Sequence, residues 1–507
     1  MASEKTPLLK NEEGNEDIIN SRVPYYWSER WKLAYILFIG TMAHLSLRTN
    51  LSVSIVCMVN QTNSSNTYLH NQSISRSDEG TLNWDITTQT GLLSAYFYGY
   101  LILQIPGGWL SSKFGPRKVI GIGIMLAGFV TLLTPLAASQ NVICVYIIRV
   151  IAGLCGGVVY PSIYTLWGRW APPLEASLFI AVTGIGCYMG TIVTFSMTGV
   201  LCNSDFLNGW PSVYYITGGF AVLWSILWIL AVTDGPELSK RISAVERDYI
   251  LKSLNNRNPQ TETSIPWLAI LMCPATWACS VCNFCSNWLD NSLLTCMPTF
   301  MHDVLQYDIK SNGFLSCLPV VLEGVAAFFV CYIADKLRQK KILSTISTRR
   351  LFQLTAYIGA AGFLMGTGYI SKEQRTLAVV FLSISTAFNG FSMAGYSSNL
   401  LDFAPRYAGI ICSFSNFIGG FPGMIAPLVA GALTPHKSQE EWRNVFYLGG
   451  CIALLSAVLY IMLARSDIQP WAAKNIEIII ENPHSVIKVP IDDKSVNVST
   501  HDYEQQR

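Results

Sequence analysis

An arginine lies inside a stretch of this sequence that is otherwise apolar enough to cross a lipid bilayer. Residues 145–177 begin as an apolar helix that contains Arg149, and they end in a short polar loop before the next apolar run. A guanidinium stays charged at ordinary pH, and its burial at membrane depth is costly unless it faces a wet cavity or a partner. Arg149 therefore indicates a pathway for a negatively charged solute. The alternative is that Arg149 pairs with an acid elsewhere for architectural reasons.

Three other titratable residues fall at membrane depth. Asp290 and Glu323 lie in later apolar blocks, and His44 lies in the first one, four residues before Arg48 and so on the same helix face. Ionisable groups in the membrane are functional candidates by default, so all three are candidates to bind a coupling proton or cation. The alternative is that either acid pairs with an arginine or lies near a helix end in water.

Polar amides and a cysteine cluster complete the set of side chains that could do chemistry. Asn287 and Asn399 fall at positions where they would either contact a substrate or bridge helices. Cys279, Cys282 and Cys285 have a spacing that in a soluble chain could indicate metal ligation. Because they lie within an apolar helix without an evident fourth ligand, we predict no metal site.

The elements that must position these side chains are membrane-spanning helices. Of 507 residues, 51% are hydrophobic and 13% are charged, and the apolar residues gather in blocks long enough to span a hydrocarbon core as helix. Only helices or closed barrels satisfy the backbone in lipid, and the alternating pattern of a barrel is absent. The sequence therefore predicts an all-α polytopic membrane protein.

Several other classes of protein are not predicted. The net charge of +2 gives no indication of nucleic-acid binding, and we find no nucleotide loop, HExxH or nucleophile motif, so neither a nucleic-acid partner nor an enzymatic or catalytic residue is expected. The 14 cysteines lie mostly within apolar spans, where free thiols behave as small hydrophobes, and they do not indicate a disulfide framework. The polar residues 1–32 contain no cleavable signal peptide.

The apolar blocks fall into two groups of six on either side of a charged linker. The domain boundaries we predict are a tail at 1–32, an N-terminal six-helix bundle at 33–233 with a polar loop at 59–89, a linker at 234–266, a C-terminal bundle at 267–466 and a disordered tail at 467–507. Glycines recur at matching places in the fifth and eleventh spans, which is typical of transporters built from repeats. We expect 12 transmembrane helices in two bundles related by pseudo-twofold symmetry.

Loop charges orient this arrangement. The loops that we assign to the cytosol include the basic pairs Arg117-Lys118, Lys240-Arg241, Lys340-Lys341 and Arg349-Arg350. The opposite loops carry only Arg76, Lys310, Lys372, Arg375, Lys437 and Arg443. This positive-inside bias predicts that both termini are cytosolic.

Two short signals agree with that orientation. Sequons at Asn60, Asn63 and Asn71 lie in the predicted lumenal or exterior loop, where they would accept glycans. Glu4, Leu8 and Leu9 form an acidic dileucine pattern in the cytosolic tail, which would bind a clathrin adaptor and direct the protein to lysosomes.

Several motifs resemble those of the major facilitator superfamily, and within it the anion/cation symporter family. The segment GWLSSKFGPRK at 108–118 follows the superfamily's basic turn, with Ser112 where many members have Asp. More specific matches are RTNLS from Arg48, QIPGG from Gln104 and RWAPPLE from Arg169, within a resemblance that covers nearly all of residues 30–471. The family includes sialin, the vesicular glutamate transporters and the sodium–phosphate cotransporters, and the sequence is most similar to sialin.

The resemblance implies a site and also marks departures from it. In the family, arginines of the first and fourth spans meet the organic anion, and they correspond to Arg48 and Arg149. Sialin-like members carry a proton-coupling Glu where this chain has Gly156. The seventh-span Arg and second-span His of vesicular glutamate transporters are Ser286 and Leu93 here. These departures exclude proton coupling through the usual residue and disfavour glutamate as substrate; Asp290 or Glu323 then becomes the replacement coupling group.

The function that we predict is secondary active transport of organic anions, such as sialic-acid-like carboxylates or acidic amino acids, coupled to H⁺ or Na⁺ and without any cofactor. We expect a monomer in a lysosomal or other vesicle membrane, in contact with lipid. The alternatives are a sodium-dependent phosphate or organic-anion cotransporter of the plasma membrane, and a transporter-like sensor that moves nothing.

Overall fold

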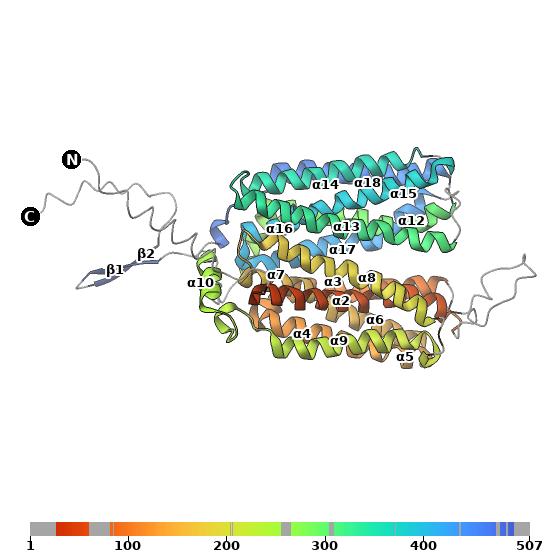
Figure 1. Cartoon of the computed structure of the whole chain (residues 1–507), viewed down its shortest axis with the longest axis horizontal. Coiled ribbons are helices and arrows are strands. Elements are labelled where there is room, and N and C mark those ends of the chain that lie inside the picture. The colour runs from red at the N-terminus through yellow and green to blue at the C-terminus, as the bar shows by residue number, and fades with distance from the viewer. Residues whose placement is uncertain are drawn as a thin grey trace, which may run out of the picture.

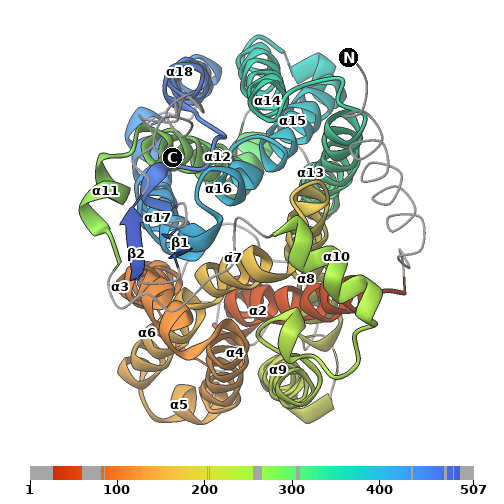
Figure 2. The same cartoon turned by 90° about the vertical axis from the view of Figure 1, so that its left-hand side faces the viewer.

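The helices run side by side along one axis and form two groups. The computed structural model describes residues 27–59, 82–84, 86–202, 204, 206–254, 265–303, 309–370, 372–434, 438–472, 477–482 and 485–490. Figure 1 shows the first half of the chain as one layer and the second half as another, and Figure 2 shows the two groups facing each other when viewed along the helices.

The first group is built from the N-terminal half. It consists of α2 (Glu29–Met58), α3 (Ile86–Phe114), α4 (Pro116–Leu132), α5 (Thr134–Gln140), α6 (Val142–Gly157), α7 (Val159–Trp170), α8 (Ala176–Cys202), a 3₁₀ turn (Phe206–Asn208) and α9 (Pro211–Ala231). The connection to the second group contains a 3₁₀ turn (Pro236–Leu238), α10 (Ala244–Ser253) and α11 (Trp267–Met272).

The second group is built from the C-terminal half. It consists of α12 (Pro274–Asp303), α13 (Ile309–Gln339), α14 (Thr345–Thr367), α15 (Arg375–Gly390), α16 (Tyr396–Phe403), α17 (Ala408–Leu433) and α18 (Gln439–Leu463), with 3₁₀ turns at Lys372–Gln374, Phe391–Met393 and Pro405–Tyr407. A last 3₁₀ turn (Pro470–Ala472) precedes strands β1 (Glu477–Asn482) and β2 (Ser485–Pro490).

The helix pairing repeats between the halves. In the first half α2 packs on α8, α3 on α6 and α4 on α9; in the second half α12 packs on α17, α13 on α15 and α14 on α18. The halves meet through α3 with α17 and through α8 with α13, which are equivalent helices exchanged between the two repeats. This is the pseudo-twofold, two-bundle arrangement expected from the sequence.

Most of the bundle helices are long and apolar enough to cross a membrane. Among the described residues, seven helical stretches are long and apolar enough to cross a membrane, and α4 with α5, bent by 40°, makes an eighth. Pro135 at the start of α5 explains the bend, since proline cannot continue the hydrogen-bond ladder of α4. The bundle helices α2, α3, α12 and α14 are not among these stretches, and α2, α3 and α12 line the central cavity together with α17.

A row of glycines brings α3 and α6 into close contact. A Cβ atom at Gly99 would collide with the carbonyl of Val150, and one at Gly153 would collide with the carbonyl of Tyr96. Both obstacles are backbone atoms, which cannot rotate away as a side chain can. The crossing therefore requires glycine on each helix, and it sets the depth at which the aromatic side chains of α3 lie against α6.

The connecting segment is fastened to the first group by buried ion pairs. The guanidinium of Arg30, at the start of α2, donates to Glu175 at 2.8 and 3.2 Å and to Glu246 of α10 at 3.3 Å. Glu246 also accepts from the main-chain N–H groups of Glu29 and Arg30, which caps α2. Burial opposes the charge of Arg30, but its hydrogen bond to Glu175 and both carboxylates outweigh burial, so the pKa of Arg30 is raised.

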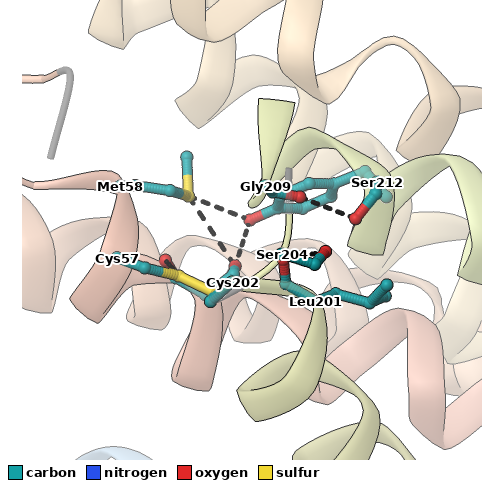
Figure 3. Close-up of a disulfide and its surroundings, with 9 residues drawn as sticks. Cys57, Met58, Leu201, Cys202, Ser204, Gly209 and Ser212 are labelled. Carbon is teal, nitrogen blue, oxygen red and sulfur yellow. Dashed lines mark hydrogen bonds between the residues drawn. A yellow bond between two sulfur atoms is a disulfide. The ribbon is translucent and has the colours of Figure 1, made fainter. Parts of the chain in front are cut away.

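A disulfide joins the C-terminal ends of α2 and α8, as Figure 3 shows for Cys57 and Cys202. Their Cα atoms are 6.2 Å apart across 145 residues of sequence, a separation that suits a disulfide. The sequence analysis, which treated the cysteines as free thiols within apolar spans, was wrong for this pair. Both residues lie at helix ends. Because 145 residues separate them in the sequence, no local pattern indicated that they pair.

The C-terminal segment differs in part from its expected disorder. Within the tail predicted at 467–507, β1 and β2 form an antiparallel hairpin in which Ile480 pairs with Ile487. Both strands are rich in Ile and Val, residue types that favour extended backbone. The sorting signal at Glu4, Leu8 and Leu9 and the sequons at Asn60, Asn63 and Asn71 lie outside the described residues.

We expect Gly153→Val to disrupt the α3–α6 crossing, because the added side chain meets main-chain atoms of Tyr96 and Tyr100. The free energy of unfolding should fall by about 1–3 kcal/mol or more. The fall would be detected as a lower melting temperature and a smaller monodisperse fraction in detergent. Gly199→Ala in α8, where an added Cβ meets nothing within 4 Å, is the matched control. Equal melting temperatures for the two variants would contradict the assigned packing.

Candidate substrate-binding site

A small cavity of about 30 Å³ lies between the two halves, and Arg48 is its cationic group. It is lined from α2 and α3 of the first half and from α12 and α17 of the second, by Arg48, Phe97, Tyr100, Asn287, Asn291, Asn416, Gly419, Gly420 and Gly423. A charged group at the junction of two repeats can be reached from both sides of the membrane in turn.

The guanidinium of Arg48 is held by aromatic rings. Its Cζ lies 4.8 Å from the ring centroid of Phe97 and 5.9 Å from that of Tyr100. Within the described ranges, no carboxylate pairs with it and no hydrogen bond engages its guanidinium nitrogens. Ring faces stabilise a cation without occupying its N–H groups, so the donors of Arg48 are available to an anion.

Amides from the second half line the cavity opposite Arg48. Asn283, one turn before Asn287 on α12, donates to Asn416 of α17 at 2.7 Å and accepts from Asn287 at 2.8 Å. It also accepts from the hydroxyl of Tyr396 at 3.2 Å. These bonds fix the amides before any ligand arrives. Rigid amides offer both donors and acceptors to hydroxyl, amide or carboxylate groups of a solute.

Arg149 lies next to Arg48 but does not line the cavity. It is 4% exposed and donates to the carbonyl oxygens of Arg48 at 3.1 Å and Leu47 at 3.5 Å, and to Asn50 Oδ1 at 3.5 Å. Its Cζ lies 5.3 Å from the ring centroid of Tyr96, while its Nε lacks a partner among the described residues. In this conformation Arg149 holds the backbone of α2 at the residue that faces the cavity.

The two arginines are thus brought together, as the sequence predicts, but with different surroundings. Neither pairs with an acid in the part of the chain that the structure describes, so the architectural ion pair considered as an alternative is not found there. The carbonyl bonds of Arg149 make it a positioning residue for Arg48 in this conformation. Direct contact of both arginines with one anion stays a prediction.

Asp290 and Glu323 meet in the second half, away from the arginines. The amide nitrogen of Asn389, on α15, donates to Asp290 at 2.7 Å and to Glu323 at 3.2 Å. Ser286 in turn donates to the Asn389 carbonyl oxygen at 3.1 Å. Tyr188 of α8, from the first half, lies within hydrogen-bonding range of Glu323. The two acids were predicted as separate candidates. In the structure both accept a hydrogen bond from Asn389, which was not among the predicted site residues.

His44 is buried beside Gly156. The imidazole is 1% exposed and packs edge-on against Tyr160, with ring centroids 5.7 Å apart. A Cβ atom at Gly156 would lie 3.0 Å from His44 Cε1 and would collide with the hydroxyl of Tyr96. Side chains from α2 and α3 therefore occupy the space that a side chain at position 156 would need.

Asn399 and the three cysteines of α12 lie outside the cavity. Asn399 is fully buried in α16 and its amide nitrogen faces the sulfur of Cys279 at 3.9 Å, so it packs between helices. Cys279, Cys282 and Cys285 are buried as well. No three His, Cys, Asp or Glu side chains gather closely enough for a metal ion within the described ranges.

A second charged cluster bridges the halves at the end of the bundle near α10. Asp402 accepts from Arg349 at 2.7 Å and from Arg338 at 3.4 Å. Arg349 reaches Ser177 at 2.8 Å, and Asp335 accepts from the main-chain N–H of Leu178 at 2.9 Å, so the cluster seals the start of α8 against the second half. Arg349 was expected only as a loop charge, but Arg349 and Arg338 are both buried here.

Comparison with known proteins identifies the family. The model of the Major Facilitator Superfamily matches residues 37–427. The chain belongs to the major facilitator superfamily. It is therefore a membrane transport protein rather than an enzyme, and the resemblance predicted from the sequence motifs is confirmed.

Similar proteins of known family indicate to which branch of the superfamily the chain belongs. The chain is 37% identical to human sialin over 485 residues, covering 93% of this chain and 95% of sialin. It is 33% identical to vesicular glutamate transporter 1 of Xenopus laevis, covering 93% and 81% of the two chains. These are relatives from the anion/cation symporter branch that the sequence predicts.

Solved structures support the fold. A proton:xylose symporter of the superfamily matches with a TM-score of 0.64 at 14% identity, covering 87% of this chain and 97% of that chain. The fucose:proton symporter of E. coli matches with a TM-score of 0.59 at 12% identity, covering 85% and 98%. At these identities the likeness concerns the fold alone.

Different roles for the two arginines predict different consequences of mutation. Arg149→Gln removes the donors to two main-chain carbonyls of α2. We expect the free energy of unfolding to fall by about 1–3 kcal/mol, which would appear as a lower melting temperature in detergent. Arg48→Gln breaks no hydrogen bond of its guanidinium among the described residues and should melt close to wild type while losing ligand binding. If Arg48→Gln is the less stable variant, the roles are reversed.

Proposed function

We propose that this protein is a secondary active transporter that moves organic anions by alternating access, coupled to a cation. The observation that carries the proposal is Arg48, whose guanidinium lies in a cavity formed by both halves and has no acidic partner among the described residues. A carboxylate bound there would gain a bidentate, charge-assisted contact in a setting where water competes poorly. The similarity to sialin and to a vesicular glutamate transporter supports the same class of substrate.

The cavity lining favours a carboxylate that also carries hydroxyl or amide groups. Asn287, Asn291 and Asn416 give the second half amide donors and acceptors, and Arg48 is the only charged group among the described residues of the lining. A solute with one carboxylate and several neutral polar groups matches that distribution, as a sialic-acid-like compound would. Ser286 is bonded to Asn389 rather than directed to the cavity, which disfavours a second carboxylate near that position.

The coupling ion would be H⁺ or Na⁺, and no cofactor is needed. Asp290 and Glu323 together would carry two adjacent negative charges if both were ionised, which binding of a proton or cation would relieve. His44 is the third candidate, and it lies on the same helix as Arg48.

For location we propose a multi-pass protein of a lysosomal or other vesicle membrane, with the plasma membrane as the alternative. The start of α2, the helix α10 and the β1–β2 hairpin lie at one end of the bundle (Figure 1), which supports placing both termini on one side, the cytosol. The Cys57–Cys202 disulfide lies at the other end, and disulfides persist in lumenal or extracellular surroundings. The tail with Glu4, Leu8 and Leu9 would bind a clathrin adaptor, and a monomer in contact with lipid would suffice for transport.

Uptake into proteoliposomes tests the transport proposal. Labelled sialic acid, L-glutamate and inorganic phosphate are offered under separate proton, sodium and voltage gradients, and we expect gradient-driven uptake of a carboxylate. Arg48→Lys keeps the charge but loses the planar fork, so uptake should fall at least about tenfold. Sodium-driven phosphate uptake would favour the plasma-membrane alternative, and no uptake of any solute by a folded protein would favour the sensor.

The orientation has its own test. If the loop at 59–89 is lumenal or exterior, its sequons carry glycans, and digestion with peptide N-glycosidase should increase the electrophoretic mobility of the protein from human cells. The triple variant Asn60→Gln, Asn63→Gln, Asn71→Gln should migrate like the digested wild type. Unchanged migration of both, with a protease-accessible loop on the cytosolic side, would invert the topology.

A further inference from the structure

His44 presents a buried nitrogen that has nothing to bind. Its Nε2 lacks a hydrogen-bond partner among the described residues, although the side chain is 1% exposed. Buried polar atoms in folded proteins are almost always paired, because an unpaired one loses its water without compensation. An imidazole nitrogen without a partner is also the atom that accepts a proton. The position of His44 therefore needs a reason beyond packing.

Among the described residues, the charged group that acts on His44 is a cation. Arg48, one turn further along α2, is the charged group that acts electrostatically on His44 among the described residues. From other elements, α3 contributes Tyr96, α6 contributes Gly156 without a side chain, and α7 contributes Tyr160. The hydroxyl of Tyr160 lies 3.0 Å from the sulfur of Cys187 on α8, which completes the nearby titratable groups.

The geometry points to His44 as the proton-binding residue of this carrier, with its proton uptake controlled by whether Arg48 holds an anion. This inference rests on the proposed function, because it assumes that the cavity binds a carboxylate. It assigns the proton to α2 of the first half, within one helical turn of the anion site, and not to the acid pair of the second half.

The coupling follows from the charge of Arg48. Without a ligand, burial and the guanidinium of Arg48 both disfavour a positive charge on the imidazole of His44. A carboxylate on Arg48 cancels that charge, and His44 Nε2 can then accept a proton from water. For two unit charges one helical turn apart at an effective dielectric constant of about 20, the effect on proton affinity is on the order of a hundredfold.

The reverse effect has the same size. Because linkage is reciprocal, a proton on His44 strengthens binding of the anion by the same factor by which the anion strengthens binding of the proton. The carrier would therefore bind both or neither and would release both on the other side. Net movement would run out of an acidic compartment, with one proton for each anion on this site.

The experiment compares His44→Gln with wild type in proteoliposomes, using the carboxylate that wild type transports from the panel of sialic acid and L-glutamate. We expect His44→Gln to keep measurable counterflow, which needs no net proton movement, but to lose accumulation driven by a proton gradient. Its half-saturating anion concentration should stay constant from pH 5 to 7.5, whereas that of wild type should rise with pH. Ser52→Ala, an exposed residue of the same helix, is the matched control and should behave as wild type.

Variants of the two acids test the alternative proton-binding site. If Asp290→Asn or Glu323→Gln loses proton-driven accumulation while His44→Gln keeps it, the proton belongs to the acid pair and the inference is overturned. If His44→Gln shows no counterflow, purified wild type decides: addition of the anion to weakly buffered protein should withdraw about one proton per bound anion, and Arg48→Gln should withdraw none. Anion binding without proton uptake overturns the inference but leaves the proposed function intact. Failure of wild type to bind either carboxylate overturns both.

Discussion

The constraint on which this structure depends is the cost of placing guanidinium groups among membrane helices. Arg149 is surrounded by carbonyl oxygens of α2 and the ring of Tyr96, and these contacts solvate its charge with protein dipoles instead of a counter-ion. An acid partner would also stabilise it, but it would cancel the positive potential at the cavity. Solvation by dipoles keeps the charge, and it fixes the backbone at Arg48. One buried arginine thus fixes the backbone at the neighbouring Arg48, whose guanidinium has no acidic or hydrogen-bond partner among the described residues.

The distribution of charge between the halves follows from the same constraint. The arginines lie in the first half and the acids Asp290 and Glu323 in the second, yet they do not meet in the described part of the chain. A buried ion pair across the interface would hold the halves together, because separating it would leave two charges unpaired. The acids instead converge on Asn389 of their own half, and the neutral Tyr188 is their neighbour from the first half. Near the cavity the contact between α3 and α17 involves glycines, such as Gly420 against Leu101, which can part without exposing charge.

The sequence predicts the helices better than it predicts which way they face. Apolar block length and loop charge suffice for the two bundles. Arg48 and Asn287, which were predicted to bind the substrate, both line the cavity. Asn399 was expected there too, but it lies in α16 against Cys279, because hydropathy does not distinguish a cavity-facing amide from one between helices. The spacing of Asn283, Asn287 and Asn291 puts them on one face of α12, and this signal in the sequence was missed. Contacts between distant segments, such as Cys57 with Cys202, left no comparable local pattern.

Gly156 illustrates how an apparent loss in sequence is part of a different arrangement in space. Read along the chain, position 156 lacks the side chain that resembling proteins carry there. In the structure the same volume is filled by His44 from α2 and Tyr96 from α3, and the glycines at 99 and 153 bring α3 close enough for Tyr96 to reach it. A side chain at 156 would displace both groups, and Tyr96 also carries the ring that faces Arg149. Glycine at this position, the histidine beside Arg48 and the close helix crossing are therefore interdependent, and none of them can change without disturbing the surroundings of both arginines.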